Sequence, residues 1–202
     1  MPIALLALPA AFRVSIATAG LLLAGYAPGV AVGGPVLTIA TRSLPRKTVL
    51  LSLMAIFTLG NVACAVAPNY ESLMAARVLT SLAHGTFFGV GSVVATGLVP
   101  PQRPASAIAI TFTGLTAATL LGVPAGAWLG LHHGWRPTFW AVALIGVVAF
   151  VVLAIFVPRD GKQKEAPAPL RDELAVLARP QVLLGLAITV FGFAGVFALF
   201  TH

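Results

Sequence analysis

Long runs of apolar residues alternate with short polar turns along the chain. A helix that crosses the hydrocarbon core of a bilayer needs about 20 such residues, at a rise of about 1.5 Å each. None of the runs shows the alternation of apolar and polar positions that marks the strands of a membrane β-barrel. We therefore predict an all-α integral membrane protein with about six transmembrane helices, near residues 15–40, 48–67, 71–99, 105–131, 138–157 and 182–201.

Two segments fall outside this pattern. Residues 1–14 contain an apolar run of only about eleven positions, which is too short to span a bilayer. This segment also lacks the basic start and the clear cleavage site of a signal peptide, so we interpret it as a remnant or an interfacial segment. The stretch 158–181 is rich in Pro, Lys and Glu, which is typical of a linker loop. The expected organisation is a short apolar remnant (1–14), a transmembrane bundle of about five helices (15–157), a cytoplasmic linker loop (158–181) and one further helix (182–202).

Three of the predicted helices carry small residues at every fourth position. On an α-helix this spacing produces a groove that lets a neighbouring helix approach closely. In the run 105–131, Pro124 lies within the groove, and its missing N–H and crowded ring predict a kink. The glycines either pack helices together or also act in gating, and the sequence leaves both interpretations open. They are Gly25, Gly29 and Gly33 in the first helix, Gly85 and Gly89 in the third, and Gly114, Gly122, Gly126 and Gly130 in the fourth.

Composition supports a membrane protein. The 202 residues are 59% hydrophobic and only 8% charged, and the mean hydropathy is +1.01. A soluble domain carries about 25% charged residues. The net charge of +7 belongs to loop residues, so we expect no nucleic-acid partner. The single cysteine, Cys64, excludes an intrachain disulfide and a cysteine-based metal site, and we expect it to be buried.

The distribution of positive charge predicts the orientation in the membrane. Nine of the 12 Lys and Arg residues lie in the segments 41–47, 100–104 and 158–181, whereas the turn 132–137 holds Arg136 alone. Positively charged loops stay on the cytoplasmic side. The first three segments are therefore expected to face the cytoplasm, in a multi-pass protein of the plasma (inner) membrane.

Arg77 and His84 are the candidate functional residues within a predicted span. A charge inside a membrane helix is costly and usually functional, although an arginine can also extend its side chain to the interface. His84 follows Arg77 by two helical turns, and an imidazole titrates close enough to neutral pH to carry a proton. A packing role for His84 stays open.

The chain offers little for catalysis or metal binding. The only acidic residue before position 159 is Glu71, at the start of a predicted helix, and no Ser–His–Asp arrangement or phosphate-binding loop is present. We therefore expect neither an enzyme nor a cofactor. His132 and His133 lack nearby carboxylates, which argues against a metal site. Trp135 and Trp140 are expected to belong to an aromatic belt at the membrane surface.

Several motifs resemble those of the major facilitator superfamily, within the drug:proton antiporter group that includes arabinose- and chloramphenicol-type efflux proteins. The stretch 121–126 (LGVPAG) is similar to the antiporter motif of the fifth helix, and 134–139 (GWRPTF) to the family's W-R-x-x-F turn. The segments 76–79 (ARVL) and 83–85 (AHG) look like the fourth-helix motif. The basic turn, residues 41–47, resembles the family's signature loop between helices two and three through Arg42, Arg46 and Lys47. The outer turn, residues 132–137, supplies Trp135 and Arg136 of the W-R-x-x-F motif.

This resemblance implies a partial major-facilitator bundle in which the predicted spans are helices two to seven. It departs from the family where Thr41 precedes Arg42 in place of an acidic residue, where helix one is reduced to residues 2–12, and where helices beyond the seventh are missing. The implied function is proton-coupled efflux of small amphipathic molecules, drugs or sugars, by alternating access, with Arg77 and His84 in coupling. The implied partners are the bilayer, protons, a small-molecule substrate and the missing second half. A membrane-embedded structural or assembly subunit, or an inactive remnant, is the alternative.

Overall fold

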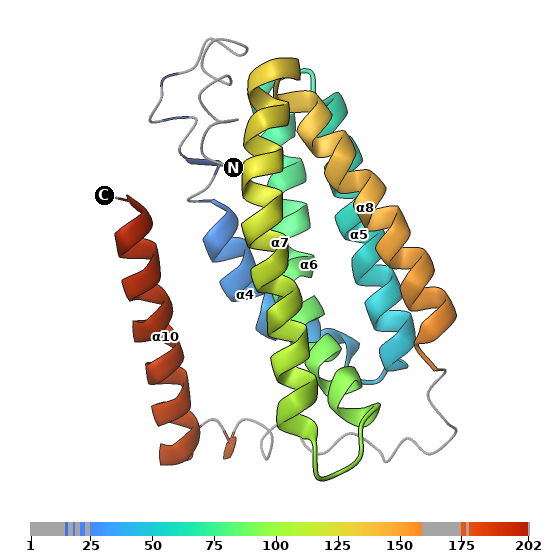
Figure 1. The fold of residues 1–202 in the computed structure, drawn as a ribbon, viewed down its shortest axis with the longest axis vertical. Helices are drawn as coiled ribbons and strands as arrows, with labels where there is room; N and C mark the ends of the chain where they lie inside the picture. Colours follow the sequence, from blue (N-terminus) through green and yellow to red (C-terminus); the bar gives the residue numbers. More distant parts are fainter. Residues whose placement is uncertain are drawn as a thin grey trace. The chain divides into compact units, whose positions relative to one another are not determined.

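The computed structural model of the chain describes residues 25–158 and 178–201, together with the isolated positions 15, 18, 21, 22, 175 and 176; beyond residue 191 it describes only the backbone. The described elements are all helices, as the apolar runs predict (Figure 1). They are α4 (Tyr26–Thr41), α5 (Arg46–Val66), α6 (Tyr70–Gly97), α7 (Pro104–His133), α8 (Trp135–Phe156) and α10 (Pro180–Thr201).

The chain divides into two compact units, residues 1–162 and residues 163–202. The first unit holds α4 to α8 and the second holds α10. The division falls within the segment 158–181 that we expected to be a linker, but most of that segment and all of residues 1–14 lie outside the described residues. The predicted domain boundaries therefore stay predictions.

Four described helices are long and apolar enough to cross a membrane, namely α5, α6, α7 and α8. Helix α4 has 16 residues and is shorter than the predicted span 15–40. The described positions 18, 21 and 22 are also helical, and Gly25 lies in a turn between them and α4. Gly25 itself keeps helical backbone angles, with φ −71° and ψ −23°, and its N–H donates to the backbone oxygen of Leu21 at 2.7 Å.

Helices α4 and α6 pack at very short range through glycines. A Cβ atom built on Gly33 would lie 2.5 Å from the Cα of Leu82, and one built on Gly29 would overlap the side chain of Ser81. A Cβ on Gly85 would lie 2.8 Å from the backbone oxygen of Val30. These backbones can approach closely only because the glycines lack a side chain at the contact.

Helices α5 and α8 lie side by side, and basic residues secure both ends of the pair (Figure 1). The Lys47 ammonium, at the start of α5, donates hydrogen bonds to the backbone oxygens of Ala154 and Val157 at 2.7 and 2.6 Å, where α8 ends. The Arg136 guanidinium, at the start of α8, donates to the backbone oxygen of Ala67 at 2.9 Å, where α5 ends. Each helix therefore satisfies carbonyls that the other leaves without intrahelical partners.

Replacing Lys47 by methionine is expected to lower the free energy of unfolding by about 2 kcal/mol. Hydrogen bonds from a charged donor contribute roughly 1.5–3 kcal/mol each. The partial exposure of Lys47 to solvent reduces this contribution. Titration of the protein in mixed micelles with sodium dodecyl sulfate measures the change. Arg103→Met, at an exposed position before α7, is the matched control. An equal loss of stability in both variants would show that the contact with α8 contributes nothing specific.

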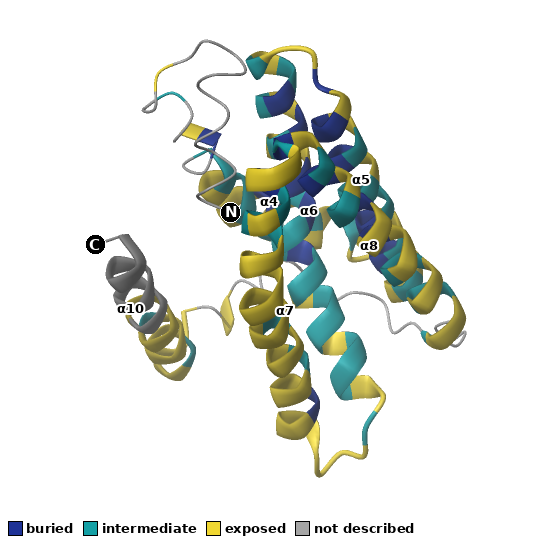
Figure 2. Ribbon diagram, turned by 45° about the horizontal axis from the view of Figure 1, so that its top comes forward, coloured by how far each residue is buried: buried dark blue, intermediate teal, exposed yellow. Residues whose placement is uncertain are grey.

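Helix α7 differs from its neighbours because almost all of it is exposed (Figure 2). Only 6% of its most apolar window is buried within the structure. No described atom from a neighbouring element lies within 4 Å of a Cβ built on Gly114 or Gly122. Gly130 is buried, and a Cβ built on Gly126 would lie 3.8 Å from Cγ2 of Thr138. Most of the predicted groove thus faces open space in the described part of the chain.

The turn between α7 and α8 is a single residue, Gly134. Its φ of 82° with a ψ of 176° is a backbone conformation that residues with a side chain rarely adopt. The glycine lets the chain leave α7 and begin α8 at once, so α8 starts at Trp135, three residues before the predicted span.

Candidate functional site

Arg77, Tyr26 and His84 come together between α4 and α6. The guanidinium carbon of Arg77 lies over the Tyr26 ring, 4.5 Å from its centroid, a cation–π geometry. The Tyr26 hydroxyl and Nδ1 of His84 are 3.2 Å apart, within hydrogen-bond distance. Tyr26 therefore connects the two residues that the sequence singled out, and we refer to the three as the polar cluster.

Local packing explains how the polar cluster forms. Tyr26 precedes Gly29 and Gly33 by three and seven residues, so it occupies the face of α4 that packs on α6. Because Gly29 and Gly85 have no side chains, the two helices can approach closely. At this separation the Tyr26 ring lies between Arg77 and His84. The polar cluster is a consequence of the close glycine contact.

The position of Arg77 differs from that of a residue reaching for the membrane surface. Arg77 lies two turns into α6, and its side chain is half-buried over Tyr26. Among the described residues the structure gives it no carboxylate partner; Glu71, the only acidic residue before position 159, is exposed at the start of α6. The described part of the cluster therefore presents a positive charge within the span.

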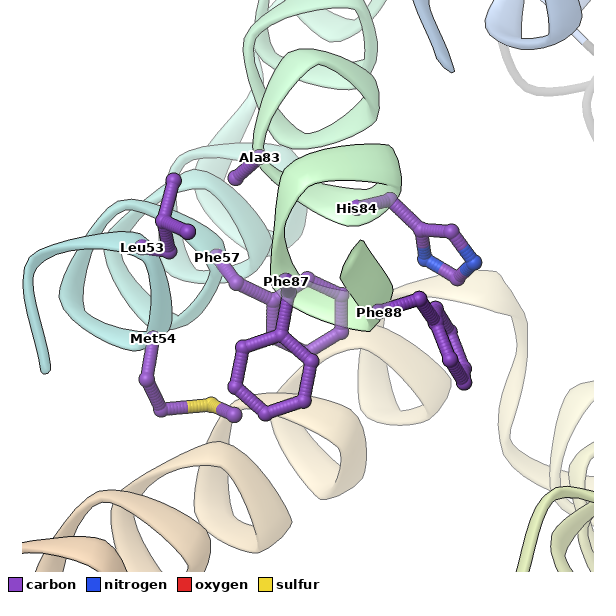
Figure 3. Close-up of a pocket in the computed structure, with 7 residues that line it drawn as sticks. All are labelled: Leu53, Met54, Phe57, Ala83, His84, Phe87 and Phe88. Atoms are coloured by element: carbon purple, nitrogen blue, oxygen red, sulfur yellow. The ribbon is translucent and has the colours of Figure 1, made fainter. Parts of the chain in front are cut away.

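A pocket of about 180 Å³ lies beside the polar cluster (Figure 3). Its walls come from the middle of α5 and the middle of α6. Apart from the imidazole of His84 every lining side chain is apolar, and three of them are phenylalanines. The lining residues are Leu53, Met54 and Phe57 from α5, and Ala83, His84, Phe87 and Phe88 from α6.

The structure places the other predicted site residues at three further locations. Gly25 lies against Met74 of α6, whereas Gly89 has no described atom near a Cβ built on it. In the basic turn, Lys47 contacts the end of α8, and Arg42 and Arg46 are exposed. Neither the glycine groove of α7 nor the basic turn contributes to the polar cluster.

The outer turn does not form the predicted aromatic belt at Trp135. This side chain is only 6% exposed, and it packs edge-on against Phe139, one turn further along α8, with ring centroids 6.0 Å apart. The Arg136 guanidinium stacks on its ring at 4.8 Å. Trp135 is buried because Gly134 starts α8 early and turns this residue toward the core. Trp140, by contrast, is 49% exposed.

Two expectations about reactive residues can be compared with the structure. Cys64 is completely buried, as predicted. His132 contacts the backbone oxygen of Trp128 through Nδ1 at 2.8 Å. Within the described residues no group of three or more potential metal ligands occurs.

The fold and the polar cluster define a class of protein: a multi-pass helical membrane protein that holds a charged residue inside the bundle. Comparison with known families is consistent with this class. A family model described as Major Facilitator Superfamily matches residues 1–202, so the chain belongs to the Major Facilitator Superfamily. Because the family is one of transporters, the prediction that this is not an enzyme is confirmed at the level of the family.

Relatives of this chain include transport proteins of bacteria. It is 50% identical over 189 residues to the inner membrane transport protein YdhP of Escherichia coli, 38% identical over 190 residues to a chloramphenicol resistance protein of Streptomyces lividans, and 35% identical over 191 residues to the putative transporter AraJ of E. coli. These alignments cover 93–94% of this chain but 48% of each relative. The chain thus spans about half the length of the curated relatives it matches.

A solved structure confirms the fold. The crystal structure of a peptide transporter, POT, in complex with alafosfalin superposes with a TM-score of 0.66. The match covers 92% of this chain and 42% of the transporter, at 16% sequence identity. The prediction of a partial major-facilitator bundle in a multi-pass inner-membrane protein is confirmed by these comparisons and by the membrane-length helices.

Proposed function

We propose that the protein carrying this chain exports small amphipathic molecules, drugs or sugars, by proton-coupled alternating access. The observation that carries the proposal is the polar cluster, because it holds an arginine and an imidazole two to four turns inside α6. Polar groups at such a depth are costly and mark substrate or proton pathways in membrane proteins. The similarity to a chloramphenicol resistance protein supports a drug-like substrate.

In this proposal the members of the polar cluster have separate roles. Arg77 attracts the negative charge of a substrate or of a deprotonated site, and His84 takes up and releases a proton. Tyr26 holds the imidazole in place through its hydroxyl and supports the guanidinium with its ring. Movement of one bundle against another would expose this region to each side of the membrane in turn.

The proposal is tested by expressing the protein in a bacterial host that lacks its main drug exporters. Efflux of chloramphenicol and of a fluorescent dye is followed with and without a protonophore. We expect efflux that stops when the proton gradient is collapsed. Stable insertion without efflux of a broad set of amphipathic compounds would contradict the proposal and favour a structural or assembly subunit, or an inactive remnant.

The proposal also assigns a partner to α7, namely a second helical bundle. The open glycine face around Gly114 and Gly122 supports this assignment, as does the matching of only about half of each relative. Small residues on such a face allow close packing of membrane helices.

Replacing Gly122 by leucine is therefore expected to reduce efflux at least tenfold while leaving insertion and thermal stability unchanged. The new side chain meets no described atom, so the described bundle tolerates it, but it would hold a second bundle away from α7. Efflux and melting temperature are measured on the same preparations. The control is Val123→Phe, which adds bulk at the next position on a different face. Normal efflux by Gly122→Leu would refute the assignment.

A further inference from the structure

We propose that the pocket between α5 and α6 binds a molecule with a single aromatic ring and an uncharged or anionic polar substituent. The inference rests on the proposed function, because it names the class of molecule that such a transporter would carry. It is independent of the open face of α7, since the pocket lies within the described bundle. Four features of the pocket support it: size, lining, charge and depth.

The size of the pocket suits one ring. Its volume is about 180 Å³. An engineered apolar cavity of about 150 Å³ is large enough to bind benzene. A substituted benzene therefore fits within it.

The lining favours an aromatic ring over other apolar groups. The Phe57 side chain extends from α5 toward α6, its ring overlaps that of Phe87 in the view, and the Met54 side chain ends beside them (Figure 3). Phe87 and Phe88, which also line the pocket, are perpendicular, with ring centroids 6.3 Å apart. Aromatic pairs and sulfur–aromatic contacts add to the gain from burying apolar area.

His84 supplies the polar contact. It is the only lining residue with a polar side chain, and its Nδ1 is already within hydrogen-bond distance of the Tyr26 hydroxyl. The described residues provide no partner for its other ring nitrogen. A hydroxyl or carboxylate on the bound ring can therefore hydrogen-bond to that nitrogen, while the ring occupies the apolar part of the pocket.

The charge around the pocket disfavours cations. Arg77 belongs to the same polar cluster as His84, through Tyr26. No acidic residue precedes position 159 apart from Glu71, which lies 13 residues before His84 and about 20 Å away along α6. A cationic ligand would thus be repelled by the Arg77 charge with no nearby carboxylate to offset the repulsion. An anionic or neutral ligand would not be repelled.

The depth of the pocket is that of a transport site. His84 is close to the middle of the 28 residues of α6, and Met54 is close to the middle of the 21 residues of α5. Substrate sites of secondary transporters lie near the bilayer midplane. The pocket therefore lies at the depth expected for a molecule in transit.

Three probes that share a phenyl ring and differ in charge test the inference. They are benzyl alcohol, phenylacetate and benzylammonium, and their binding to the purified protein in lipid nanodiscs is measured by saturation-transfer NMR, with empty nanodiscs subtracted. We expect benzyl alcohol and phenylacetate to bind at least fivefold more tightly than benzylammonium. Equal binding of all three, or no binding above the empty discs, would overturn the inference.

Two variants locate the binding site. Phe87→Ala removes one wall of the pocket and is expected to weaken benzyl alcohol binding at least fivefold. Phe112→Ala, at a 45% exposed position on α7 outside the pocket, is the matched control and should leave binding unchanged. Circular dichroism and size-exclusion profiles establish that both variants are folded. An equal effect of the two variants would place the probe elsewhere and overturn the inference.

Failure of this inference can be distinguished from failure of the proposed function, because binding is measured without a proton gradient. Pocket binding without any efflux would support the binding site and contradict the transporter. Proton-linked efflux of aromatic compounds that is unaffected by Phe87→Ala, together with absent pocket binding, would overturn the binding site and leave the transporter standing.

Discussion

The variant Gly33→Leu is expected to abolish the folded bundle. A Cβ atom at position 33 would lie 2.5 Å from the Cα of Leu82 and 2.8 Å from its backbone oxygen, and both of these atoms belong to the backbone of α6. A side chain can rotate away from such a contact, but a helix backbone can yield only if the two helices separate. Overpacking in a core usually costs about 1–3 kcal/mol. We expect the yield of monodisperse protein to fall at least tenfold, which corresponds to about 1.4 kcal/mol or more.

The yield is measured by fluorescence-detected size exclusion after membrane solubilisation. Gly89→Leu is the control, because it introduces the same side chain into α6 at a position with no described atom within 4 Å of the Cβ. Its yield should be close to that of the parent protein. A monodisperse Gly33→Leu variant with the parent's melting temperature would show that α4 and α6 do not pack as described. Because Tyr26 is on the same helix, Gly33→Leu should also disrupt the polar cluster.

The helices could be predicted well from the sequence. In a bilayer, a run of about 20 apolar residues satisfies its backbone hydrogen bonds only as an α-helix. The hydropathy of the run therefore also predicts its secondary structure. Helix α5 begins at Arg46 and ends at Val66, against a predicted 48–67. The larger error at the start of α8 arises from its first turn, where Pro137 is tolerated and Gly134 permits an abrupt reversal. Hydropathy does not detect either effect.

The packing of the glycine faces could be predicted only in part. The spacing of small residues fixes which face of a helix is smooth, but it does not identify the helix that packs there. The faces at Gly29 and Gly33 are filled by α6, whereas those at Gly114 and Gly122 are open in the described structure, although the spacing is the same. Pairing depends on the topology of the whole bundle, which local spacing does not contain.

The polar cluster is only partly visible in the sequence. Arg77 and His84 stand out because charged and titratable groups are rare inside membrane spans. Tyr26 does not, because a single tyrosine inside the predicted span 15–40 carries no charge and does not titrate near neutral pH. Its register with Gly29 and Gly33 is the available signal, since residues three and seven apart share a helix face. The pocket gives no such signal, because its lining comes from two helices and no motif connects them.

Arg77→Ala is expected to eliminate proton-linked transport by the complete protein. The substitution removes the positive charge that lies over Tyr26 and leaves the aromatic ring and His84 without it. If Arg77 attracts a substrate anion or a deprotonated site, the variant loses this electrostatic attraction. We therefore expect uptake into inverted vesicles driven by a pH gradient to fall at least tenfold. Arg77→Lys, which keeps the charge but not the planar group, should retain part of the activity, because lysine stacks less well on an aromatic ring.

Tyr26→Phe separates the two contacts of the polar cluster. It keeps the ring beneath Arg77 and removes the hydroxyl that lies 3.2 Å from His84. If the arginine acts alone, this variant should transport like the parent protein, whereas a role for the imidazole predicts a changed dependence of transport on pH. Each variant must insert and elute as the parent does, because a fully misfolded Arg77→Ala protein would also lose uptake. Unchanged proton-driven uptake by a folded Arg77→Ala variant would refute the coupling role, and Arg77 would then serve only to pack α6 against α4.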